Sequence, residues 1–178
     1  MKIIGYLILT ISLVFFVWQI YSASTSSKYD QMDVQQLGKV DGIEFKIYNK
    51  YTKASLSINS NNMRNANNKF SVLANYIFGG NQENTQIGMT SPVIYNMTNQ
   101  STFSFIMPAK MENNLPLPNN DEIFFKTVHN QCVAVITFGG FAKQEKCEKK
   151  HEELKQKLSK IGLSFDDDFI VAVYQAPY

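Results

Sequence analysis

Apolar and polar residues alternate in two neighbouring stretches of the chain, residues 43–48 and 53–58. A period of two residues is typical of strands with one buried face. Residues 143–161 instead place Leu154 and Leu158 at the spacing of one helical face, and Gly162 follows as a left-handed cap. The same patterns predict a further helix over residues 63–78, which Gly79 and Gly80 end, and further strands over residues 87–97 and 169–174. The buried stripe of this helix is expected to consist of Phe70, Leu73, Ala74 and Ile77.

The second half of the chain repeats the first half eighty positions later. Phe45 corresponds to Phe125, and Ala54 corresponds to Ala134. In each half, paired strands are followed by a helix and then by another strand. Two such units predict an α+β fold with a helix covering one side of each part of the sheet.

An apolar segment without charged residues occupies positions 3–20, directly after Lys2. As a helix it would rise about 27 Å, close to the thickness of the hydrocarbon core of a bilayer. We predict an apolar helix within residues 1–21 that serves as an uncleaved membrane anchor. A cleaved signal segment is the alternative, with small residues at 22–24 as a weak cleavage site.

The polar stretch after this segment predicts a linker over residues 22–39, followed by a domain over residues 40–178. Positive charge before the apolar segment places the domain on the extracytoplasmic side of the membrane. If the segment is cleaved, the domain is secreted or periplasmic.

The net charge argues against nucleic-acid binding, and the spacing of the cysteines argues against a disulfide. The formal net charge of +2 offers no basic excess for binding nucleic acid. Cys132 is expected near the start of a strand and Cys147 in the first turns of the returning helix. This spacing separates the sulfur atoms too far for a disulfide, so we predict two free thiols.

No catalytic motif emerges, and we predict that the protein is not an enzyme. The sequence has no serine in a nucleophile elbow, no histidine pair at metal spacing and no phosphate-binding glycine loop. We interpret His129 as a hairpin-turn residue and His151 as a solvated residue on a helix. Met89 and Met107 are interpreted as core residues, and the acidic residues 166–168 as a solvated turn.

Several short motifs occur in a particular order. They are Gly-Gly-Asn at 79–81, Met-Thr-Ser-Pro-Val at 89–93, Phe-Ser-Phe-Ile-Met-Pro at 103–108, Leu-Pro-Leu-Pro-Asn at 115–119, Phe-Gly-Gly-Phe-Ala at 138–142 and Tyr-Gln-Ala-Pro-Tyr at 174–178. This order resembles the SOUL haem-binding protein family. The resemblance implies a distorted antiparallel β-barrel with two helices and pseudo-twofold symmetry, related to bacterial effector-binding domains. It also implies a closing strand that this sequence lacks after position 178.

The resemblance further implies non-covalent binding of haem or another planar amphipathic tetrapyrrole in a groove. That groove lies between the first helix and the loop after the last strand. The residues at matching positions are Met63, Arg64, Lys69, Val72, Tyr76 and Tyr174.

Arg64 and Lys69 would meet the propionates, and we expect no fixed axial ligand. The helix face available for the groove also carries Asn68, Ser71 and Asn75, which are polar. The alternative is therefore a protein-interaction module whose groove receives an apolar helix or peptide and no cofactor.

Overall fold

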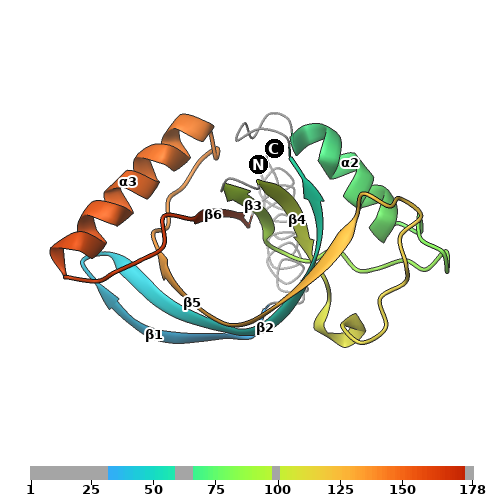
Figure 1. Cartoon of the computed structure of the whole chain (residues 1–178), viewed down its shortest axis with the longest axis horizontal. Coiled ribbons are helices and arrows are strands. Elements are labelled where there is room, and N and C mark those ends of the chain that lie inside the picture. The colour runs from blue at the N-terminus through green and yellow to red at the C-terminus, as the bar shows by residue number, and fades with distance from the viewer. Residues whose placement is uncertain (1–31, 59–65, 98–100, 175–178) are drawn as a thin grey trace, which may run out of the picture.

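The computed structural model describes residues 32–58, 66–97 and 101–174. Figure 1 shows an antiparallel sheet curled into an arc, with one helix on each flank. The elements in chain order are β1 (Val34–Val40), β2 (Ile43–Ser57), α2 (Ala66–Ile77), β3 (Val93–Met97), β4 (Thr102–Ile106), the short 3₁₀ helix η2 (Ala109–Met111), β5 (Phe124–Val135), α3 (Gln144–Lys160) and β6 (Phe169–Val173). This curled half-barrel with two helices is the α+β architecture that the sequence predicts. The apolar helix expected within residues 1–21 lies outside the described residues.

β2 is the strand around which the sheet is built. Along one edge it pairs with β1 through its first half and with β4 through its second half. Along its other edge it pairs with β5 from Glu44 to Ser55. β3 then joins β4 to β6. The prediction of two separate strands at 43–48 and 53–58 is wrong, because β5 pairs along both stretches and joins them into one continuous strand.

Each helix packs on its own part of the sheet, but the two cores differ in size. Beneath α2, the buried side chains of Leu73, Tyr76 and Ile77 join those of Leu56 and Phe103 in the largest hydrophobic cluster. A smaller cluster near α3 contains Cys147 of that helix, Met97 and Val171. Both cysteines are free, as predicted, with Cys147 buried and Cys132 exposed.

The ends of the helices lie close to their predicted positions. α3 ends at Lys160, and Gly162 follows with φ +73°, the left-handed conformation that glycine adopts without steric penalty. The amide of Leu163 then donates to the carbonyl oxygen of Leu158 at 3.1 Å, which satisfies a free carbonyl of the last turn.

Two predicted boundaries and one predicted residue position differ from the structure. β1 starts at Val34, so it overlaps the linker expected over residues 22–39 and precedes the expected domain start at residue 40. The strand expected over residues 87–97 is regular only from Val93. His129 does not occupy a turn: it lies within β5, opposite Lys50 of β2.

Two predicted core residues are more exposed than expected. Met89 is exposed in the irregular segment before β3, whereas Met107 is buried as predicted. Phe70, assigned to the buried stripe of the first helix, remains partly exposed. Its ring nevertheless contacts those of Phe103 and Phe105, with centroid distances of 6.4 and 5.3 Å.

Candidate functional site

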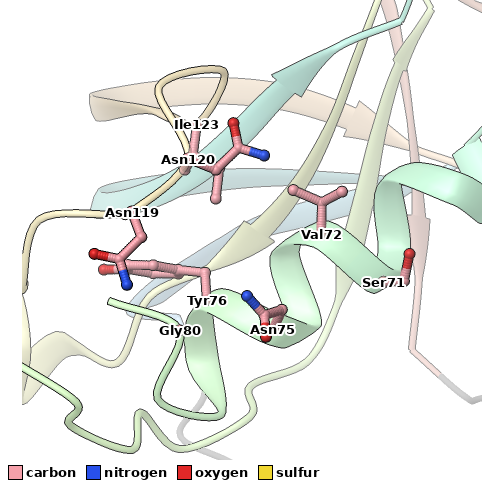
Figure 2. A pocket seen from close by; sticks show the side chains of 8 residues that line it. All are labelled: Ser71, Val72, Asn75, Tyr76, Gly80, Asn119, Asn120 and Ile123. Carbon is pink, nitrogen blue, oxygen red and sulfur yellow. The ribbon is translucent and has the colours of Figure 1, made fainter. Parts of the chain in front are cut away.

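A hollow of about 340 Å³ lies between α2 and the loop that precedes β5 (Figure 2). From α2 and its exit come Ser71, Val72, Asn75, Tyr76 and Gly80, and from the loop come Asn119, Asn120 and Ile123. Tyr76 and Ile123 are buried and present little surface. The accessible lining is therefore Val72 surrounded by amide and hydroxyl groups.

The Gly-Gly-Asn motif at residues 79–81 shapes the end of this hollow that lies at the exit of α2. Gly79 has φ +104°, which ends the helical path. A Cβ atom on Gly80 would collide with the side chain of Asn75, so only glycine fits there without a shift. The amide of Gly80 donates to the carbonyl oxygen of Asn75 at 2.8 Å. The two glycines thus bring the chain back against the helix.

Asn81 completes the motif as a buried structural residue. Its side-chain amide donates to the carbonyl oxygens of Tyr76 at 3.0 Å and Thr85 at 2.7 Å. Its side-chain oxygen accepts from the Thr85 amide at 3.0 Å. Because these bonds join the loop to the end of α2 and occupy its side-chain amide, Asn81 stabilises the helix exit and is not available to a ligand.

Tyr76, expected as an apolar contact of the groove, lines the hollow but is almost fully buried. Only 1 % of the residue is exposed, and its hydroxyl donates to the carbonyl oxygen of Pro116 at 2.9 Å. Burial, with a smaller contribution from the charge of Glu83, raises the pKa of Tyr76 to about 12. Tyr76 therefore fixes the Leu-Pro-Leu-Pro loop against α2, which forms one wall of the hollow.

The structure separates the other predicted site residues. Val72 lines the hollow. Lys69 pairs with Glu122 at 2.8 Å, so its ammonium group already has a carboxylate partner. Met63 and Arg64 lie outside the described residues.

Tyr174 does not line the hollow. It follows β6, and its carbonyl oxygen accepts a hydrogen bond from the Ser91 hydroxyl at 3.1 Å. Partial burial, followed by a hydrogen bond with Tyr48, raises the pKa of its phenol. The predicted groove between the first helix and the loop after the last strand also involves residues 63–65 and 175–178, which lie outside the described ranges.

Sequence reasoning missed the contribution of the loop before β5. Asn119, Asn120 and Ile123 have no periodic pattern, and only the preceding prolines marked the segment as a loop. Its position against α2 follows from long-range contacts, including the bond between Tyr76 and Pro116 and the bridge between Asn81 and Pro118.

Neither histidine lines the hollow. His151 is not simply solvated on α3: its ring stacks on Phe169 of β6, with a centroid distance of 4.1 Å. Burial, followed by the charge of Lys155, lowers the pKa of His151. Within the described ranges, no group of three or more His, Cys, Asp or Glu side chains could hold a metal ion. Those ranges also contain no helix that is long and apolar enough to cross a membrane.

Comparison with known proteins supports the order of motifs seen in the sequence. The family model of the SOUL heme-binding protein matches residues 26–178, which is most of the chain. A search of curated proteins found no significant match. The match includes β1, both helices and the loop that forms the hollow. The chain therefore belongs to the SOUL haem-binding protein family.

Proposed function

We propose that this domain binds haem or another tetrapyrrole non-covalently in the hollow beside α2, without a fixed axial ligand and without catalysing a reaction. The observation that carries the proposal is the family match across residues 26–178. The hollow supports it, because its volume of about 340 Å³ lies within the range of small-molecule sites.

The lining of the hollow fits one edge of a tetrapyrrole better than its ring. The side-chain amides of Asn75, Asn119 and Asn120 can donate hydrogen bonds to the carboxylates on that edge. Val72 is the accessible apolar contact for the ring. Since little apolar surface is offered, we expect weak and reversible binding.

Absorbance titration with haem tests this proposal. Adding haem to the full chain should shift the Soret band at micromolar concentrations. The Val72→Asp variant should weaken binding by about tenfold, because a carboxylate would replace the apolar contact and repel the acidic edge of the ligand.

Asn68→Asp is the matched control, since it introduces the same charge on an exposed part of α2 that does not line the hollow. It should leave the titration unchanged. The absence of a Soret shift in the unmodified protein would contradict haem binding.

The polar lining also favours a second candidate function, a protein-interaction module that uses the same hollow. A partner helix or peptide could hydrogen-bond the exposed amides while covering Val72. A partner captured equally well with and without haem, and lost in Val72→Asp, would support the module.

We also propose that the domain is tethered to the membrane on the extracytoplasmic side. Support comes from the eighteen uncharged residues at 3–20 and from Lys2 before them. Mass spectrometry of the native protein distinguishes an intact N-terminus, which the tether requires, from one cleaved after residues 22–24.

Finally, we infer that the two halves of the domain arose by duplication. The register between β2 and β5 supports this inference, because Phe45 lies opposite Ala134 and Ala54 lies opposite Phe125. A rotation that exchanges the strands would therefore superpose each residue on its counterpart eighty positions away.

A further inference from the structure

Lys53 lies on the face of the sheet that points away from α2, and only 5 % of the residue is exposed. Successive side chains of a strand point to opposite faces. Ala54 and Leu56 of β2 belong to the core beneath α2, so Lys53 points to the other side. In the register of the sheet, Lys53 lies opposite Lys126 of β5 and Ile106 of β4.

Lys53 has no acidic partner among the described residues. The ion pairs found there join other lysines to carboxylates, as in the pairs of Lys69 with Glu122 and Lys50 with Glu112. Lysine is rarely this buried without a paired charge, because its ammonium group loses hydration. The arrangement is therefore unfavourable for the protein alone.

The residue directly across the sheet increases this cost. Lys126 carries the same charge, and like charges opposite one another destabilise a strand pair. Burial and then the charge of Lys126 lower the pKa of Lys53. A negative charge beside the two lysines would relieve both effects.

The surrounding side chains indicate what kind of molecule would bring that charge. Phe124 and Val128 flank Lys126 on the same face of β5, and Phe124 is exposed. Ser55 and Ser104, next along this face, hydrogen-bond each other at 2.9 Å. Two cations thus lie beside apolar surface, with Lys126 exposed toward solvent.

We propose that Lys53 and Lys126 together bind the carboxylate of an amphipathic ligand whose apolar chain lies over Phe124 and Val128. The ligand supplies the negative charge that the described residues lack, and both ammonium groups donate charge-assisted hydrogen bonds to it. This site is separate from the hollow beside α2, because it lies on the opposite face of the sheet.

Calorimetric titration of the full chain with sodium decanoate tests the proposal, with 1-decanol as the uncharged probe of equal chain length. The unmodified protein should bind decanoate at least about tenfold more tightly than 1-decanol. Lys53→Met should abolish this preference, and Lys126→Gln should reduce it. Lys149→Gln, on the exposed surface of α3, is the matched control and should retain it.

Chemical denaturation separates a binding role from a structural one. If Lys53 is kept for a ligand, Lys53→Met should unfold at a higher urea concentration than the unmodified protein, because an apolar side chain of similar length suits a buried position better. Equal affinity for decanoate and 1-decanol would overturn the proposal. So would an unchanged preference in Lys53→Met, or a lower midpoint of its unfolding.

The haem-site variant Val72→Asp keeps the two proposals distinguishable. It should retain the preference for decanoate while losing affinity for haem. Loss of both would place the two ligands at one site and overturn the separate carboxylate site.

Discussion

α2 and α3 occupy equivalent positions in the two halves of the chain, but they differ in how many of their side chains are buried. α2 buries Leu73, Tyr76 and Ile77 almost completely in a cluster that continues into β2 and β4. α3 is longer, yet its buried residues are Cys147 and Leu158 alone. Most of its surface carries charged side chains.

This difference shows which part of the domain contributes most to its stability. Burial of apolar surface is the main stabilising contribution, and it is concentrated beneath α2. Contacts of α3 include the stack of His151 on Phe169 and the ion pair of Lys155 with Asp167 at 2.7 Å. Exposed ion pairs of this kind contribute little. The hollow beside α2 is therefore built on the more stable half.

The largest expected effect comes from truncating a leucine in each helix. Leu73→Ala should lower the free energy of unfolding by about 3–5 kcal/mol, because it leaves a cavity in the main cluster. Leu158→Ala should lower it by about 2 kcal/mol, since Leu158 is buried but belongs to none of the hydrophobic clusters of the described residues. Urea denaturation followed by circular dichroism measures both. Equal decreases in the free energy of unfolding would show that core packing stabilises the two halves equally, which would contradict this comparison.

A smaller effect is expected from Tyr76→Phe, which tests the wall of the hollow. The change removes the hydrogen bond to the carbonyl oxygen of Pro116 and should reduce the free energy of unfolding by about 1–2 kcal/mol. Haem affinity should fall together with stability, because the loop carrying Asn119 would no longer be fixed. The same haem titration as for Val72→Asp measures this fall.

The pH dependence of the same variant sharpens this test. Folding raises the pKa of Tyr76 from 10 to about 12, so its contribution is present below pH 10 and is lost as the pH rises toward 12. Tyr76→Phe should therefore lose less stability over this interval than the unmodified protein. Parallel urea midpoints for the two proteins between pH 8 and pH 11 would contradict the assignment.

The smallest expected effect concerns α3 and acid. Because folding lowers the pKa of His151, its contribution is present above about pH 6.5 and is lost as the pH falls below that value. Hydrogen exchange should show reduced protection of α3 and β6 at pH 5.5 relative to pH 7, with protection of α2 unchanged. His151→Gln should remove this difference, whereas His129→Gln in β5 should not.

The sequence by itself determined the local elements and the family. Alternation along residues 43–58 and helical periodicity along residues 143–161 identified strands and a helix, because these patterns follow from the geometry of one buried face. The Gly-Gly-Asn motif marked the exit of α2, because few residues other than glycine adopt φ +104°.

Only the tertiary structure decided which face of each element is covered. Tyr76 is polar enough to suit a surface, but the carbonyl of Pro116, forty positions away, allows its burial. Lys53 reads as an ordinary polar residue of an alternating strand, and its burial opposite Lys126 follows from the pairing of β2 with β5. These contacts join segments that are far apart in the sequence, and the hydrophobic periodicity of each segment does not specify its partner.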